Sequence, residues 1–281
     1  MKSKDTSWND VADWYDDLFS DADSYQREVI LPNLVRIAGD LRGKKVLDIA
    51  SGQGFFSHAF AKAGAEVVGV ELSPKLVNIA REHATNKEIF YAGSAEKLPN
   101  EIKSGAFDVC LCVLAFQNIQ KLDAVISEAS RALVHGGRFL IVLNHPAFRI
   151  PKRSEWGFDP VVDFGIAEQG SARGRRDTKI HYGVDESHAV QYRRMNGYMS
   201  ESSEHISMHP GKSPQTETVS FHRPLQLYFK SFSKHHFAVE RLEEWISHKT
   251  SEKGPRKTAE DRARKEFPLF LFLGLRKENI P

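Results

Sequence analysis

A glycine-containing loop joins a short apolar run to a predicted helix, and this unit constrains the fold more than any other feature. Residues 46–57 read VLDIASGQGFFS, so the predicted strand carries Asp48 and the loop carries Gly52 and Gly54. Glycine allows backbone angles that other residues avoid and lets the chain approach a ligand closely. The first amides of the helix, predicted over about 55–63, suit a bound carboxylate. The unit therefore predicts an α/β fold with a ligand at the end of the strand.

A second acidic residue, Glu71, ends the next predicted strand, residues 66–71. Open α/β sheets bind ligands at the carboxyl ends of their strands, where a carboxylate can accept hydrogen bonds from both hydroxyls of a ribose. A dinucleotide-binding fold is a competing interpretation, but its G-x-G-x-x-G fingerprint needs a third glycine where this chain has Ser57. A glycine turn that binds no ligand is the other alternative.

Predicted strands and helices alternate from residue 45 to residue 143. The strands are predicted at 45–49, 66–71, 89–92, 107–114 and 138–143, with helices at 55–63, 74–84 and 122–133. Gly136-Gly137 is a predicted turn before the last of these strands, and Cys110 and Cys112 share one face of a strand as predicted core thiols. Apolar strands between amphipathic helices predict a parallel sheet covered on both faces.

The pattern changes near Asn144, after which Gly, Ser, Arg, His and aromatic residues become frequent. A structureless loop of this length is unusual in a compact domain, so residues 146–220 are interpreted as an inserted substrate cap with short β-like pieces at 189–193 and 217–221. The sheet pattern then resumes. It has a predicted helix at 224–235, strands at 237–246 and 267–275, and an exposed polar stretch at 250–265. The predicted organisation is a helical lid at 1–42, a sheet domain at 43–145 and 221–281, and the cap.

Composition sets broad limits on the class of protein. With 41% hydrophobic and 27% charged residues, the chain is expected to fold around a core. The net charge of +2 does not by itself indicate a nucleic-acid partner. The first residues lack an apolar signal region, and no apolar run approaches the roughly 18 residues of a membrane-spanning helix. We expect a cytoplasmic protein without a membrane partner, and its oligomeric state is left open.

The region from about residue 43 to residue 143 resembles the class I S-adenosylmethionine (SAM) dependent methyltransferases, of the small-molecule, methyltransferase-type-11-like kind. The resemblance implies a Rossmann-like sheet, mostly parallel with an antiparallel last strand, with helices on both faces and an inserted cap. It also implies SAM as the cofactor, S-adenosylhomocysteine as its product, and methyl transfer to a small-molecule acceptor.

The resemblance further implies which residues hold the cofactor. The loop that holds the methionine part of SAM in that family matches Asp48, Ala50, Gly52 and Gly54. The ribose-binding acid matches Glu71, and Leu72 flanks the adenine. A Gly-Asp-Ala segment of the family matches residues 93–95, where Ser94 replaces the acid, so the Ser94 hydroxyl or the Ala95 backbone is expected to contact the adenine.

Other expected site residues surround the transferred methyl group. The residues after the fourth strand, Ala115 to Asn118, are expected to line the reaction site, with Ala115 beside the cofactor and Asn118 orienting the acceptor. Tyr15 and Tyr25, in the helices that resemble the family's lid, are candidates to contact cofactor or substrate. His145 directly follows the fifth strand, and its imidazole suits proton removal from a hydroxyl acceptor. An oxygen acceptor is therefore preferred, although in-line displacement at a sulfonium does not require a base.

Two alternative functions stay open. Basic residues in 173–179, 193–194 and 253–265 could contact RNA phosphates in an RNA methyltransferase, or Arg193-Arg194 could meet an anionic substrate or form a solvated face. A non-catalytic SAM-binding homologue is motivated by Ser94. No metal site is expected, because His205 and His209 lack a convincing ligand pattern.

Overall fold

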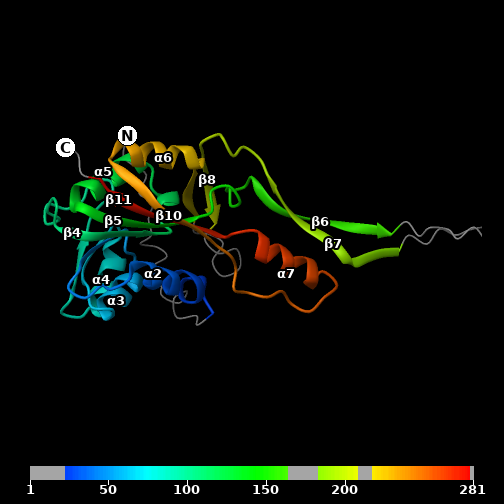
Figure 1. Cartoon of the computed structure of the whole chain (residues 1–281), viewed down its shortest axis with the longest axis horizontal. Helices are drawn as coiled ribbons and strands as arrows, with labels where there is room; N and C mark the ends of the chain where they lie inside the picture. Colours follow the sequence, from blue (N-terminus) through cyan, green and yellow to red (C-terminus); the bar gives the residue numbers. More distant parts are fainter. Residues whose placement is uncertain (1–22, 164–182, 208–216, 279–281) are drawn as a thin grey trace, which may run out of the picture.

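Seven strands form one central sheet in the computed structural model, which describes residues 23–163, 183–207 and 217–278. The strands are β1 (Lys45–Ile49), β2 (Glu66–Glu71), β3 (Glu88–Ala92), β4 (Phe107–Val113), β5 (Leu133–Asn144), β10 (Phe237–Trp245) and β11 (Phe270–Lys277). Their order is β10-β11-β5-β4-β1-β2-β3 (Figure 1). Neighbours among β1 to β5 run parallel, whereas β11 lies antiparallel to both β5 and β10. This topology confirms the predicted fold class.

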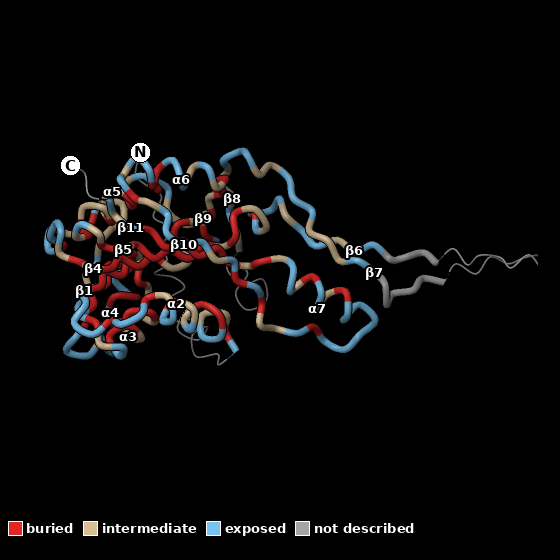
Figure 2. The backbone as a smooth tube through the Cα atoms, in the orientation of Figure 1, coloured by how far each residue is buried: buried red, intermediate tan, exposed pale blue. Residues whose placement is uncertain are grey.

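Helices cover both faces of the sheet, as the alternating pattern predicts (Figure 1). On one side lie α2 (Leu31–Ala38), α3 (Phe55–Lys62) and α4 (Pro74–Glu82), and on the other side lie α5 (Leu122–Ala132) and α6 (Leu225–Lys234). Side chains alternate along each strand, so Val46 and Val109 pack toward α3 while Leu47 and Cys110 pack toward α5. Cys110 and Cys112 are free and fully buried, which confirms them as core thiols. Figure 2 shows the buried residues gathered in the sheet and on the helix faces turned to it.

The inserted segment forms two hairpins that do not join the central sheet. One pairs β6 (Ser154–Asp163) with β7 (Gly183–Met195), and the other pairs β8 (Ser202–Ser207) with β9 (Glu217–His222). The β6–β7 hairpin is an arm that projects from the body, with α7 (Lys257–Glu266) packed along β7 (Figure 1). The β8–β9 hairpin is attached to the body by β9, which packs on the short 3-10 helix η3 (Phe116–Asn118). The predicted β-like pieces lie within β7 and β9.

Three predicted element boundaries differ from the structure. A turn was predicted at Gly136-Gly137, but β5 already begins at Leu133, which pairs with Phe107. Gly136 adopts a φ of +71° there, so the glycine absorbs a register irregularity inside the strand instead of making a separate turn. The predicted polar stretch at 250–265 contains the amphipathic helix α7, and the last strand starts at Phe270 instead of residue 267.

The predicted N-terminal lid lies largely outside the described residues, and so does Tyr15. Within it the structure describes a π-helical turn, η2 (Gln26–Ile30), that continues into α2. Tyr25 packs edge-on against His248 and Phe270, and its hydroxyl lies 3.1 Å from Ser247 Oγ. Within the described residues, no helix is both long enough and apolar enough to cross a membrane.

Candidate functional site

The glycine loop after β1 brings backbone amides to the carboxyl edge of the sheet. Ala50, Gly52 and Gly54 all have positive φ angles, of 59°, 57° and 85°. A Cβ atom on Gly54 would lie 2.8 Å from His58 Nε2 and 3.0 Å from Phe90 Cζ, so only glycine fits at the start of α3. The Ser51 amide donates to the Val70 carbonyl at 3.1 Å, which holds the loop against β2.

Asp48 lies beneath this loop, on the α3 face of β1. Its Oδ2 accepts a hydrogen bond of 2.7 Å from the hydroxyl of Ser57 on α3, and both side chains are buried. Burial raises the pKa of Asp48 to about 7; the Ser57 hydrogen bond acts in the opposite direction, and the nearby charge of Glu71 adds to the rise. Asp48 therefore anchors the loop to α3 from below.

Glu71 joins the glycine loop to the start of α4. Its Oε2 accepts from the Gly52 amide at 3.1 Å, and its Oε1 accepts from the Ser73 amide at 2.9 Å. The side chain is buried, and burial raises the pKa of the carboxyl although these two amides act against the rise. The next residue, Leu72, is 47% exposed, so an acidic and an apolar side chain stand together at the end of β2.

The residues at this edge fit SAM on grounds of hydrogen bonding and shape. A carboxylate offers about four acceptor positions, and the two amide bonds leave Glu71 capacity for ribose hydroxyls. Ser51 Oγ and Gln53 Oε1 are buried without a hydrogen-bond partner within the described residues, and both belong to the glycine loop. Such orphaned buried groups are costly unless a ligand or water satisfies them. Leu72 supplies an exposed apolar surface on which a base can stack.

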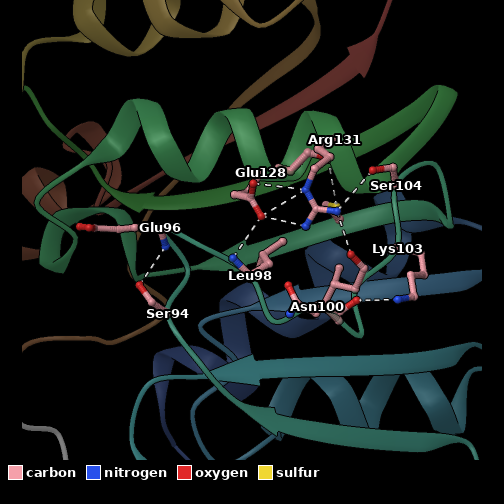
Figure 3. A network of polar contacts seen from close by, with 11 residues as sticks. Ser94, Glu96, Leu98, Asn100, Lys103, Ser104, Glu128 and Arg131 are labelled. Atoms are coloured by element: carbon pink, nitrogen blue, oxygen red, sulfur yellow. Dashed lines mark hydrogen bonds and ion pairs between the residues drawn. The ribbon is translucent and has the colours of Figure 1, made fainter.

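The loop after β3, which carries Ser94, is tied to α5 (Figure 3). Glu128 Oε2 accepts from the Leu98 amide at 3.1 Å, and Arg131 pairs with Glu128 and donates to the Ile102 carbonyl at 2.8 Å. Ser94 Oγ accepts from the Glu96 amide at 3.1 Å, so the hydroxyl stabilises its own turn and keeps its proton to donate. Ala95 is half-buried against the core. The adenine contact of Ser94 and Ala95 stays a prediction.

A cavity of about 220 Å³ opens where β4 and β5 end. The lining includes Gln117 of η3, Asn144 at the end of β5 and Pro146 just after it. It also includes Ser220 to Arg223, at the end of β9. The Gln117 side chain donates to the Leu114 carbonyl, while its Oε1 is buried without a partner among the described residues. The cavity therefore lies at the same carboxyl edge of the sheet as the glycine loop and Glu71.

Asn118 and Ala115 lie next to this cavity, in or beside η3. Asn118 Nδ2 donates to the Val219 carbonyl of β9 at 3.3 Å, so the amide fastens the inserted hairpin to the body. Ala115 precedes η3 and is half-buried, just after Leu114, which has a positive φ of 53°. Orientation of the acceptor by Asn118 and a cofactor contact of Ala115 stay predictions.

His145 is buried, and both of its ring nitrogens are engaged. Nδ1 accepts from the Ala147 amide at 3.2 Å, and Nε2 lies 2.8 Å from Glu244 Oε1. Because Nδ1 accepts, Nε2 carries the proton and donates to the carboxylate. The ring also packs on Phe148. These contacts let His145 order the chain where it leaves β5, and its part in proton removal stays a prediction.

We expect the His145 imidazole to titrate below its ordinary pKa of 6.5, because burial favours the neutral ring more strongly than Glu244 favours the charged one. The contribution of the neutral ring to stability is therefore lost as pH falls through this lowered pKa. An NMR titration of the ring protons measures the value, and Glu244→Gln should lower it further. A pKa above 6.5 would contradict the buried arrangement.

The sheet order, the glycine loop and the acid after β2 are arranged as the resemblance to the class I SAM-dependent methyltransferases implies. Residues 47–141 match the family described as "Methyltransferase domain". A SAM-dependent methyltransferase structure from Mesorhizobium loti has the same fold, with a TM-score of 0.61, 20% identity, and coverage of 90% of this chain and 98% of that one. SAM is the cofactor of this class of domain.

Two relatives in sequence each match less than half of the chain. A ubiquinone biosynthesis O-methyltransferase of Xanthomonas oryzae pv. oryzae is 34% identical over 133 residues, which cover 44% of this chain and 55% of that protein. A ubiquinone/menaquinone biosynthesis C-methyltransferase of Rhizobium johnstonii is 31% identical over 142 residues, covering 46% and 54%. The chain thus spans about half the length of the relatives it matches.

Sequence reasoning did not assemble the cavity. It singled out Arg193 among several basic runs and weighed His222 among the solvated or pocket histidines, but it gave no role to Arg149 or Arg223. These residues lie in segments far apart in the chain, and no shared periodic pattern links them. The only signal available was the excess of arginine, histidine and aromatic residues after Asn144.

Proposed function

We propose that the chain transfers a methyl group from SAM to a small-molecule acceptor. The observation that carries this proposal is the pairing of Glu71 with the Gly52 amide at the edge of the sheet that also opens into the cavity. The matched methyltransferase domain and the two relatives named for quinone biosynthesis support a small acceptor. Their names include both an oxygen-methylating and a carbon-methylating enzyme, so the preference for an oxygen acceptor stays a prediction.

The protein's own residues would act by binding and alignment. Glu71 would hold the ribose, the loop from Gly52 to Gly54 would lie against the methionine part, and Leu72 would flank the base. Asp48 would keep the loop in place through Ser57. The acceptor would occupy the cavity beside Gln117, shielded from water by the β9 segment. Holding donor and acceptor in line is the main contribution that such a site makes to the rate.

When bound, SAM would supply a methyl group on a positively charged sulfur: the acceptor atom would bond the methyl carbon as the carbon–sulfur bond breaks with its electron pair left on sulfur, and an acceptor atom that carries a proton would release it to solvent. The chain needs no strong base for an acceptor that is already an anion. For a neutral hydroxyl acceptor a base would help, and His145 stays the candidate for it.

Calorimetric titration with S-adenosylhomocysteine tests the cofactor assignment. We expect micromolar binding, about −8 kcal/mol, at one site. Incubation with methyl-labelled SAM and a panel of small hydroxyl-, carboxyl- and quinone-bearing acceptors then tests transfer. Folded protein that binds no S-adenosylhomocysteine would contradict the proposal, and folded protein that binds it but transfers methyl to no acceptor would favour the non-catalytic alternative.

A further inference from the structure

The cavity at the ends of β4 and β5 carries an unusual concentration of positive charge. Arg149, Arg193, Arg223 and His222 line it, and no aspartate or glutamate is among its described lining residues. Arginine side chains stay protonated in proteins and carry five donor N–H groups each. The charge state of the cavity is therefore set by three guanidinium groups.

Arg149 reaches the cavity from the segment after β5. The residue is exposed to solvent, but many protein atoms lie around its guanidinium. This partial loss of water, together with the charge of Arg193, lowers the pKa of the guanidinium. Its Nη1 donates to Asn144 Oδ1 at 2.6 Å, and its guanidinium carbon lies 5.8 Å from the centre of the Phe270 ring. No carboxylate pairs with it within the described residues. These contacts orient Arg149 but leave most of its donors free.

Arg193 stands at the base of the arm and is held from three sides. Nε donates to the Phe148 carbonyl at 2.9 Å, Nη2 donates to Ser154 Oγ at 2.9 Å, and the guanidinium lies 4.9 Å from the Trp156 ring centre. Like Arg149, it has no carboxylate partner among the described residues. Its fixed position and remaining donors suit it to bind a ligand oxygen beside Arg149.

Arg223 has a different part in the same cavity. It is buried and donates to the carbonyls of Phe116, Ile119 and Gln120, at 3.2, 2.8 and 2.7 Å. These neutral acceptors satisfy its hydrogen bonds but do not neutralise its charge. No carboxylate pairs with Arg223 within the described residues. A buried charge without a counterion is costly, so the cavity favours an anion over a neutral guest.

The rest of the lining mixes polar side chains with apolar and aromatic ones. Ile150 and Ile206 supply apolar surface, and Phe221 and Tyr228 supply aromatic surface. A guest suited to this lining carries a negative group for the arginines and an apolar body for these four side chains.

We propose that the methyl acceptor is a small carboxylic acid with an apolar or aromatic body, whose carboxylate is bound by Arg149 and Arg193. A planar carboxylate matches the fork of a guanidinium, and such charge-assisted pairs are the stronger class of hydrogen bond. The two arginines thereby determine which class of substrate the site binds. This inference rests on the proposed function, because it assigns the group that the cavity recognises in the acceptor.

Benzoate and benzamide form a matched pair of probes, because they share shape and differ in charge. Ligand-observed NMR on the full chain, with and without S-adenosylhomocysteine, measures the binding of each. We expect benzoate to bind at least about tenfold more tightly than benzamide. Arg149→Met, which keeps the apolar stem, should abolish this preference. Arg194→Met is the matched control, since Arg194 is the neighbour of Arg193 on β7, is exposed, and pairs with Glu155 at 3.1 Å.

Equal binding of the two probes, no benzoate binding at about 10 mM, or an unchanged preference in Arg149→Met would each overturn the inference. Inorganic phosphate and phenyl phosphate are included to test whether the cavity prefers a phosphate group to a carboxylate. Tighter binding of these than of benzoate would replace the carboxylic acid by a phosphate ester and contradict the proposal. Failure of the proposed function is distinguishable, because S-adenosylhomocysteine would then not bind even if benzoate does.

Discussion

Glu71→Ala is expected to weaken S-adenosylhomocysteine binding by about 30- to 150-fold, which corresponds to about 2–3 kcal/mol. The substitution removes the proposed acceptor of the ribose hydroxyls. It also releases the Gly52 and Ser73 amides, which Glu71 holds at 3.1 and 2.9 Å, so the loop is no longer fixed in its binding geometry. Calorimetry measures the loss directly.

Glu66→Ala is the matched control for this experiment. Glu66 begins the same strand, β2, but lies at the opposite edge of the sheet and is exposed. We expect wild-type affinity in this variant, and circular dichroism shows whether both variants keep the fold. An affinity of Glu71→Ala equal to that of Glu66→Ala would remove Glu71 from the cofactor site.

Asp48→Asn is expected to raise the free energy of unfolding relative to the wild type, and this gain should be about 2–3 kcal/mol larger at alkaline pH than at about pH 5. Burial raises the pKa of Asp48 from 3.8 to about 7, so the folded state favours the protonated carboxyl. The wild type therefore loses stability as pH rises between these two values, where the unfolded chain has already released the proton. Asparagine carries no charge at any pH and can still accept from Ser57.

Urea unfolding of the wild type and Asp48→Asn at about pH 5 and about pH 8 measures this difference. Other titrating groups, including Glu71 and His145, are present in both proteins, so their contributions largely cancel. Glu66→Gln controls for the removal of one carboxylate at an exposed position of the neighbouring strand. A stability difference that is the same at both pH values would show that Asp48 does not titrate in this range.

The part of the fold with a clear hydrophobic period could be predicted from the sequence. The strand at 45–49 and the strand at 66–71 match β1 and β2, because apolar residues with glycine or charged residues at both ends leave little choice of boundary. Glu71 could be placed at the end of β2 for the same reason. Its two backbone partners could not be predicted, because they depend on how the loop from Ala50 to Gly54 bends back toward β2.

The cavity and the inserted segment could not be predicted at this level. Residues 146–220 have no sustained period of two, so neither the length of β6 and β7 nor their separation from the central sheet was evident. The position of Arg149 beside Arg193 depends on the turn after β5 and on the register of β7. His145 shows the converse case, since its place after a strand was evident but its engagement by Glu244 and Ala147 was not.

The reversed strand β11 has a consequence for biosynthesis. It lies between β5 and β10, and β10 contacts the rest of the sheet through it. On a ribosome, β5 and β10 both emerge before residues 270–277, so until then β5 can pair only with β4 and β10 has no strand of the sheet to pair with. The edge of β5 thus presents unpaired backbone groups, a feature that promotes aggregation of nascent chains. The hairpins and α6 are synthesised in this interval, and the nascent sheet must wait for Phe270 before it can close.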